Sequence, residues 1–392
     1  MAHKIIMLGG RRSGKSSILS SILYALDKNT SGDLFVVSDQ TDYSANDSTD
    51  GVCVRLRDKR MEVDNYLKTR QKVGENSSFL VDMTPTKGKS SYLFRTDIKG
   101  AAPVDFEFVD VPGEWMEDTS TRHNELKKII CESDVYVIAI DTPYMMQQEN
   151  ENINTVYNRI DEITSMMANI MIDNEEYDKK LIILCPVKCE KWVRHGRAED
   201  VATAVKNTYR TLINTWVNHK AVDIWIMPIQ TIGGIEHSKL LDGYRLFKSA
   251  NDKFGELCSK NELTGQIMLK DGKILSASSV YMVDSEPDKS LYFSYTQIPL
   301  SWYITNEAGF SPRFCEQPAY HILEFLVHKE ELVMDMKDRN LGSGFWGWLR
   351  RLFNPPFGKY LQKYQEMTKQ LEEKGIIKKN EDGFIHVESI VN

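Results

Sequence analysis

The sequence predicts an α/β fold in three layers, with a mostly parallel central sheet covered by helices on both faces. Short apolar runs bounded by turn residues recur along the chain, and segments of helical periodicity lie between most of them. Strands that alternate with helices form parallel sheets buried on both faces. The predicted strands are 4–8, 91–98, 104–111, 134–141, 180–186 and 222–229, and the predicted helices are 15–27, 121–132, 151–172, 198–218 and 318–331.

The second and third predicted strands differ from the others. The segment 91–98 alternates between apolar and polar residues, and only the short stretch 99–103 joins it to 104–111. A short connection and an alternating pattern are typical of antiparallel neighbours. We therefore expect these two strands to form an antiparallel pair at one edge of the sheet.

Two stretches interrupt the alternation of strands and helices. Residues 28–90 are rich in polar residues and glycine, with one predicted helix near 59–71. Residues 238–300 contain a predicted hairpin at 265–275, in which Asp-Gly is a strong turn signal. We expect both stretches to be insertions into the α/β domain.

The composition changes again beyond about residue 335. We therefore predict one α/β domain over 1–332 and a tail over 333–392. Within the tail, 341–357 combines five aromatic residues with two arginines. Contact of 345–357 with a membrane interface is one interpretation, but the glycines in this stretch favour docking on the chain's own core or a partner protein instead. The segment 360–375 that follows is predicted to be an amphipathic helix.

Charge and composition exclude several classes of protein. A net charge of -7 provides no basic field for nucleic acid. The six cysteines have no paired CxxC spacing, so neither a zinc site nor a disulfide framework is indicated. No apolar stretch is long enough for a membrane span, and no signal-peptide core precedes the first strand. We expect a cytoplasmic protein.

The first chemical motif is a phosphate-binding loop (P-loop). Residues 9–16 read G-G-R-R-S-G-K-S directly after an apolar run, and such loops direct their amides and a helix N-terminus at an anion. Lys15 is predicted to reach the β- and γ-phosphates, and the Ser16 hydroxyl to ligate Mg²⁺. The predicted nucleotide contacts here are Gly9, Gly10, Arg12, Ser13, Gly14, Lys15, Ser16 and Ser17. We therefore expect the chain to bind a nucleoside triphosphate.

A second motif, D-V-P-G-E at 110–114, begins near the end of the predicted strand 104–111. Asp110 is suited to hold Mg²⁺ through water, and the amide of Gly113 to contact the γ-phosphate.

Two further segments lie at strand ends where a base would bind. In V-K-C-E at 187–190, the stem of Lys188 is suited to lie on a purine face, and Glu190 to accept hydrogen bonds from guanine N1–H and N2–H₂. The strand 222–229 runs into Q-T-I-G-G, where Thr231 and Gly233 are predicted to face the base. An ordinary structural turn is the alternative for this last loop.

The order of these motifs resembles the Ras-like, translation-factor-related P-loop GTPases over about residues 1–332. Details of the motifs, together with F-C-E-Q-P at 314–318, look most like the bacterial double-GTPase families, which are predicted components of conflict and defence systems. The resemblance implies a P-loop NTPase fold, GTP and GDP as ligands, and Mg²⁺ as cofactor. It also implies a threonine before the second strand whose hydroxyl completes the Mg²⁺ coordination; Thr84 and Thr86 are the candidates by position, and Thr86 is preferred.

The chain also departs from that family at several positions. Val187 stands where Asn or Thr is usual, and Glu190 is one methylene longer than the usual Asp, which weakens the case for guanine. Glu114 replaces a water-orienting glutamine. Arg11 and Arg12 replace small residues, and three interpretations stay open: they neutralise phosphate, act across a dimer, or are solvated. Lys15, Glu114 and Arg11 are the catalytic candidates.

We expect a slow, Mg²⁺-dependent GTPase that acts as a switch. GTP would order residues 79–90 and 110–122, and hydrolysis would change the affinity for a partner protein or for a second copy of the chain. One alternative is a nucleotide-loaded scaffold with little hydrolysis. Another is an ATP-binding P-loop protein such as a kinase, although no acceptor site with a general base is evident.

Overall fold

The structure is a computed structural model, and its described residues fall into two compact units. The larger unit draws on 1–60, 85–231 and 312–392, and the smaller unit on 61–84 and 232–311. The described residues are 2–29, 35–41, 61, 64–65, 67–68, 79–80, 88–98, 104–117, 121–146, 151–168, 179–219, 221–247, 256–260, 266–270, 273–275, 292–306, 309–340, 366, 369, 373 and 381–387.

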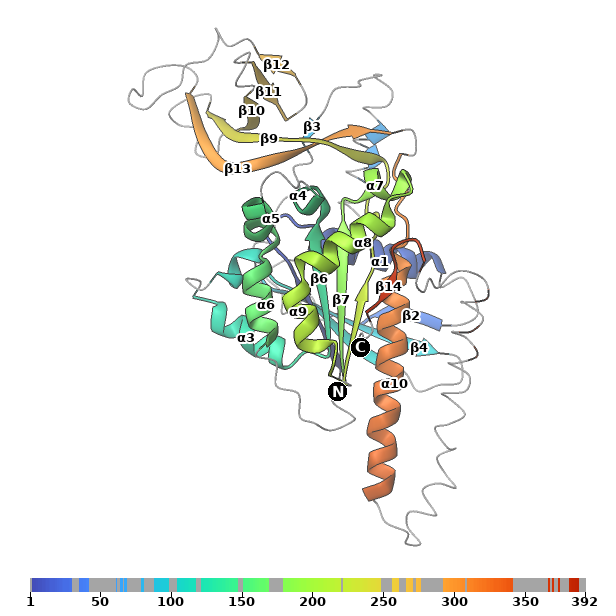
Figure 1. The fold of residues 1–392 in the computed structure, drawn as a ribbon. Coiled ribbons are helices and arrows are strands. Elements are labelled where there is room, and N and C mark those ends of the chain that lie inside the picture. Colours follow the sequence, from blue (N-terminus) through green and yellow to red (C-terminus); the bar gives the residue numbers. More distant parts are fainter. Residues whose placement is uncertain are drawn as a thin grey trace. The chain divides into compact units, whose positions relative to one another are not determined.

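The larger unit is built on an eight-stranded mixed sheet with the order β14-β8-β7-β6-β1-β5-β4-β2 (Figure 1). The five strands from β8 to β5 are parallel, whereas β4, β2 and β14 are antiparallel to their neighbours. The strands are β1 His3–Leu8, β2 Phe35–Asp39, β4 Ser90–Ile98, β5 Val104–Asp110, β6 Val135–Asp141, β7 Lys180–Val187, β8 Val222–Ile226 and β14 Ile385–His386. The predicted α/β fold with a mostly parallel sheet is confirmed.

Helices cover both faces because the central strands are apolar on both sides. In β1, Ile5 and Met7 belong to one core with α1 and α10, while Ile6 and Leu8 belong to the other core with α3, α6, α8 and α9 (Figure 1). The helices are α1 Lys15–Asn29, α3 His123–Cys131, α4 Thr142–Met146, α5 Glu151–Asn158, α6 Ile160–Ala168, α7 Glu190–Arg194, α8 Ala198–Thr208, α9 Arg210–Trp216 and α10 Glu316–Asn340, with a 3₁₀ turn η2 at Gly113–Met116. No helix among the described residues is long and apolar enough to cross a membrane.

The structure corrects two predictions about these elements. The antiparallel pair β4–β5 is confirmed, but β2 pairs outside β4, so β2 and not β4 is the edge strand. This five-residue strand, F-V-V-S-D, starts with an apolar run but lies within a polar stretch, and it was not predicted from the sequence. The helix predicted over 151–172 is interrupted at Arg159, which adopts a left-handed φ of 53° between α5 and α6.

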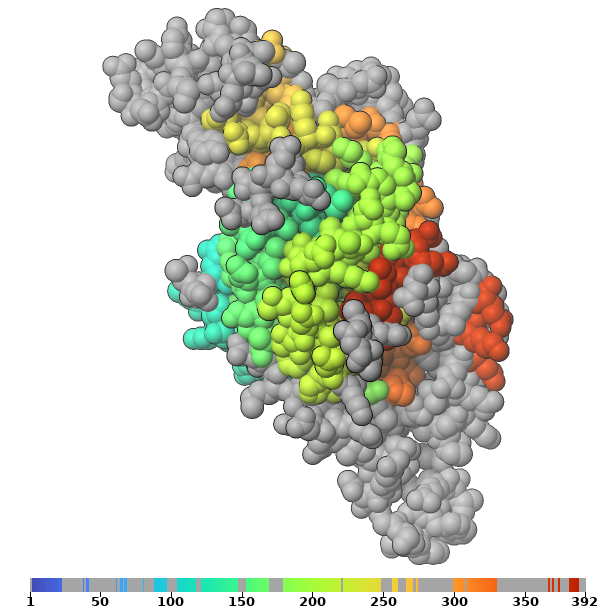
Figure 2. Space-filling view, viewed as in Figure 1, coloured from blue at the N-terminus to red at the C-terminus, as the bar shows by residue number. Residues whose placement is uncertain are grey.

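The C-terminal segment adds the other edge strand. Ile385 and His386 of β14 pair with β8, and Phe384 is fully buried with its ring against Phe314. The Gly383 amide donates to Glu199 of α8, 3.1 Å away, and the red C-terminal segment lies against the yellow-green helices in Figure 2. Part of the predicted tail therefore packs on the α/β sheet, and α10 runs past residue 332; the domain boundaries themselves stay predictions.

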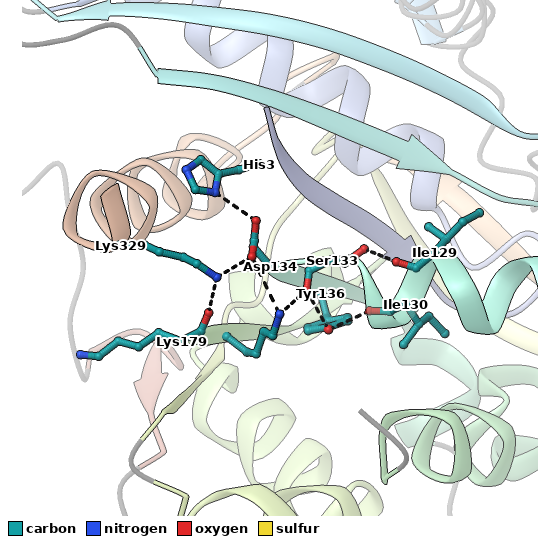
Figure 3. Close-up of polar contacts among 9 residues, drawn as sticks. His3, Ile129, Ile130, Ser133, Asp134, Tyr136, Lys179 and Lys329 are labelled. Carbon is teal, nitrogen blue, oxygen red and sulfur yellow. Dashed lines mark hydrogen bonds and ion pairs between the residues drawn. The ribbon is translucent and has the colours of Figure 1, made fainter. Parts of the chain in front are cut away.

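A network of charges holds α10 at the amino ends of the parallel strands. The Asp134 carboxylate accepts from His3 Nδ1 at 3.0 Å and from Lys329 Nζ of α10 at 2.5 Å (Figure 3). Lys180 Nζ lies 3.9 Å from the same carboxylate. Burial alone would raise the pKa of Asp134, but the His3 hydrogen bond and the Lys329 ammonium outweigh burial and hold the pKa well below its usual range.

The smaller unit is a six-stranded antiparallel sheet with the order β12-β11-β10-β9-β13-β3. The longest pair, β9 with β13, contains two register shifts. The pairing of β11 with β12 confirms the predicted hairpin at 265–275. The strands are β3 Phe79–Leu80, β9 Ile235–Phe247, β10 Glu256–Lys260, β11 Ile267–Leu269, β12 Ile274–Leu275 and β13 Tyr292–Thr305.

Candidate nucleotide-binding site

The P-loop runs from the end of β1 to the first residue of α1. Gly9 (φ 140°) and Gly14 (φ 104°) occupy backbone conformations that side chains disfavour, and Arg12 takes the left-handed region at φ 63°. A Cβ on Gly9 would lie 2.7 Å from the carbonyl oxygen of Ala139 on β6. The loop is therefore packed tightly against the neighbouring strand.

Lys15 lies folded over this loop. Its Nζ donates to the carbonyl oxygens of Gly9 and Gly10 at 2.8 and 3.0 Å. The side chain is buried, and burial lowers the pKa of Lys15 although the carboxylates of Asp110 and Glu114 counteract it. A buried ammonium ion beside the loop amides is suited to bind phosphate.

Ser16 and Asp110 come together at the carboxyl ends of two neighbouring strands. The Ser16 hydroxyl donates to Asp110 Oδ2 at 2.8 Å, because Asp110 pairs in register with Met7 of β1. A hydroxyl and a carboxylate this close are hard oxygen ligands of the kind that Mg²⁺ accepts, so these two residues fit the predicted cofactor. The other predicted ligand, Thr86, lies outside the described residues, as does Thr84.

The D-V-P-G-E motif packs directly on the P-loop. A Cβ on Gly113 would lie 2.5 Å from the Arg11 nitrogen and 2.7 Å from the Gly10 carbonyl carbon, so no side chain fits there. Glu114, in η2, forms an ion pair with Arg11, Nε to Oε1 3.3 Å. None of the three interpretations of Arg11 made from sequence included this pair.

Lys188 connects the predicted base motif to the P-loop. It follows β7 with a left-handed φ of 57°, and its Nζ donates to the Arg12 carbonyl oxygen at 2.9 Å and pairs with the Asp141 carboxylate. Asp141 ends β6 and is buried, which raises the pKa of its carboxyl group against the opposing effect of Lys188. No candidate was named in this strand from the sequence, so Asp141 was missed, although an acidic residue closing an apolar strand is the same signal as Asp110.

The remaining base-site candidates lie at neighbouring strand ends. Glu190 is the first residue of α7 and only 2 % exposed. The carbonyl oxygen of Thr231 accepts from Ser21 of α1 at 3.2 Å. Gly233 belongs to the smaller unit, where a Cβ would lie 1.9 Å from the Ser311 carbonyl oxygen; its contact with a base stays a prediction.

Gln230 was missed as a candidate side chain. Its backbone forms a pair of hydrogen bonds with Arg313, at 3.0 and 2.9 Å, while its side chain is 1 % exposed. Neither atom of the side-chain amide has a hydrogen-bond partner among the described residues. A buried amide without a partner destabilises the fold, which makes Gln230 a candidate for ligand contact.

The junction of α5 and α6 also lies against the site. A Cβ on Gly10 would lie 1.9 Å from the Tyr157 carbonyl oxygen. The Asn158 side chain accepts from the Asp141 amide at 2.7 Å and donates to the Asp141 carbonyl oxygen at 3.2 Å. No sequence motif marks these residues, because each acts through its contacts with distant segments.

A scan against known protein families found no match, and a search of curated proteins found no relative. The fold is distantly similar to solved structures of the S. cerevisiae Ski7 GTPase-like domain, one bound to GDP and inorganic phosphate and one bound to GTP. The identities are 12 % and 13 % and the TM-scores 0.30 and 0.31, over 79 % of this chain and 72 % of those chains. At this distance the likeness concerns the fold alone.

Proposed function

We propose that this chain binds GTP with Mg²⁺ and acts as a slow GTPase switch. One observation carries the proposal: two motifs far apart in sequence, D-V-P-G-E and V-K-C-E, converge on the P-loop. Asp110 contacts Ser16, Gly113 packs on Gly10 and Arg11, and Lys188 donates to the carbonyl oxygen of Arg12. A structural glycine turn has no need of such partners, whereas a Mg²⁺–triphosphate site needs a carboxylate, a γ-phosphate contact and a base contact together.

Each group has a role in binding. Lys15 and the loop amides bind the β- and γ-phosphates, and Ser16 and Asp110 hold Mg²⁺, which neutralises phosphate charge. Lys188 braces the P-loop from the base side. Because Lys15 already lies against the loop, little ordering of its side chain accompanies binding.

In this proposal, buried polar side chains determine whether guanine or adenine binds. Glu190 has a carboxylate that accepts from N1–H and N2–H₂ of guanine, which adenine does not offer. The amide of Gln230 carries both a donor and an acceptor and belongs to the neighbouring loop. Selectivity is strong where a site leaves buried polar groups unpaired with the wrong ligand, and this supports guanine over adenine.

Hydrolysis is slow in this proposal because of Glu114. A carboxylate beside the γ-phosphate is electrostatically unfavourable, and the Arg11 guanidinium offsets its charge. Glu114, which would orient the attacking water, is then already engaged in the ion pair with Arg11. Turnover rises when a partner protein or a second copy releases Glu114 from Arg11 while Glu114 stays over the P-loop, and the nucleotide state in turn controls that partner. A role in bacterial defence is an expectation from the family resemblance alone.

Equilibrium binding of GDP, GTP, ADP and ATP with Mg²⁺ tests the proposal. Guanine nucleotides should bind at least tenfold more tightly than adenine nucleotides, and Glu190→Ala should remove most of that preference while Lys15→Ala abolishes binding of both. Equal or tighter adenine binding would eliminate the guanine proposal and leave an ATP-binding P-loop protein. Guanine binding without any single-turnover hydrolysis would favour a nucleotide-loaded scaffold, which the Arg11–Glu114 pair also allows.

A further inference from the structure

Arg159 occupies an unusual position between α5 and α6. Its φ of 53° lies in the left-handed region, which side chains other than glycine adopt at a cost in free energy. Such a conformation persists only where the surroundings hold it. The two residues before Arg159 hold the backbone here. Tyr157 packs on Gly10, and the Asn158 side chain forms hydrogen bonds with both backbone groups of Asp141.

The Arg159 side chain joins two segments that are distant in sequence. Its Nη2 donates to Glu117 Oε1 at 2.6 Å, and its Nη1 donates to Glu162 Oε1 at 2.9 Å. The side chains of Arg159 and Glu117 are 25 % and 41 % exposed, so water screens the pair in part. The contact with Glu162 is local, at the start of α6, whereas the contact with Glu117 reaches the segment that follows the D-V-P-G-E motif.

Glu117 closes the 3₁₀ turn that carries Glu114. Its amide donates to the Glu114 carbonyl oxygen at 3.2 Å, so moving Glu117 moves Glu114. The segment 110–117 is thus attached to the P-loop side of the unit through Asp110 at its start, Glu114 near its middle and Glu117 at its end. The last of these attachments depends on Arg159.

We propose that Arg159 is a positioning residue for the hydrolysis proposed above, on which this inference rests. The guanidinium fixes Glu117 and thereby keeps Gly113 and Glu114 over the P-loop, where they meet the γ-phosphate. The left-handed backbone is what aims the side chain at Glu117 from a position against Gly10. A regular helix through 151–168 would carry this side chain elsewhere.

The test compares four variants of the full chain. Arg159→Gly removes the guanidinium but suits the left-handed φ, and Glu117→Gln removes the acceptor charge without touching the junction. Glu162→Gln is the matched control, because it removes only the local contact at the start of α6. The double variant Arg159→Glu with Glu117→Arg restores a pair of opposite polarity.

Two readouts are needed: the single-turnover rate of GTP hydrolysis, and hydrogen exchange of the amides at 113–117. We expect Arg159→Gly and Glu117→Gln each to lower the rate about fivefold and to weaken amide protection, with GTP affinity changed less than about twofold. Glu162→Gln should change neither readout, and the exchanged pair should recover protection.

Unchanged rate and protection in both single variants would overturn the role of Arg159, as would an equal effect of Glu162→Gln. Failure of the proposed function has a different signature. If the unaltered chain does not hydrolyse GTP, the GTPase proposal fails, while exchange at 113–117 still reports whether Arg159 holds this segment. Loss of protection only in the Arg159 and Glu117 variants would then keep the structural part of the inference.

Discussion

Arg11 in the P-loop and Glu114 in the D-V-P-G-E motif form an ion pair, with 3.3 Å between Nε and Oε1. Both residues depart from the pattern of the family that the sequence resembles, and the two departures compensate each other in charge. The side chains are 55 % and 43 % exposed, so the pair contributes little to stability, on the order of 0.5 kcal/mol. What the pair determines is the charge that bound phosphates would meet beside the P-loop.

The first prediction concerns this charge beside the P-loop. Glu114→Gln removes a negative charge and keeps the shape of the side chain, so GTP should bind about fivefold more tightly relative to GDP, since a like charge about 4 Å away costs about 1 kcal/mol in water. Arg11→Ala should shift the GTP-to-GDP ratio in the opposite direction. Titrations with both nucleotides measure the ratio, with Glu132→Gln at the far end of the sheet as a control for net charge. An unchanged ratio in Glu114→Gln would place its carboxylate away from the γ-phosphate.

The second prediction follows from the lowered pKa of Lys15. In the free protein burial lowers this pKa below the ordinary 10.5, whereas bound phosphates favour the ammonium form. Affinity for GTP should therefore be greatest at neutral pH and fall as the pH rises through the lowered pKa. Dissociation constants between about pH 7 and pH 10 reveal this slope. Lys15→Arg, charged throughout, should lack this slope and keep only the loss of affinity at the alkaline end, where guanine itself loses its N1 proton; a similar slope in that variant would assign the titration to another group.

The third prediction concerns the charge network at the opposite end of the sheet. Asp134→Asn leaves the buried ammonium of Lys329 without its ionic partner, which should destabilise the fold by about 3 kcal/mol. The folded pKa of Asp134 lies below its ordinary 3.8, so its stabilisation is complete above that value and is lost as the pH falls below it.

Denaturant unfolding of both proteins from neutral to acid pH separates these effects. The unaltered chain should lose stability relative to Asp134→Asn as the pH drops below 3.8, so that the two curves converge. Nucleotide affinity should not change, because the network lies at the amino ends of the strands. Curves that stay parallel in acid would show that another group titrates there.

The fourth prediction concerns the C-terminal segment. Phe384 is fully buried against Phe314, and truncation to alanine should cost about 3 to 5 kcal/mol. Because β14 pairs with β8 at only two residues, the loss should appear as detachment of 381–387. Hydrogen exchange at Gly383 to His386 measures this, with exposed Glu381→Ala as the control. Full protection in Phe384→Ala would mean that the backbone pairs alone hold the strand.

Local signals were sufficient for the central strands and the P-loop. Ile5 to Leu8 is apolar on both faces, which only a strand covered on both sides requires, and the glycines at 9 and 14 take the backbone conformations that their spacing implies. Edge strands were missed. Phe35–Asp39 begins with the apolar run F-V-V but is short and lies in a polar stretch, and Ile385–His386 is only two residues long, so neither was recognised as a strand.

The sequence by itself determined the α/β class, the phosphate-binding loop and the acidic residue at the end of β5, because each depends on the chemistry of neighbouring residues. Only the tertiary structure decided that Arg11 pairs with Glu114, that Lys188 reaches the P-loop and Asp141, and that Arg159 breaks a helix to hold Glu117. These contacts join residues separated by tens to more than a hundred positions. Ion pairs between distant segments leave no periodic pattern in the sequence, so these contacts can be identified only once the fold brings the strand ends together.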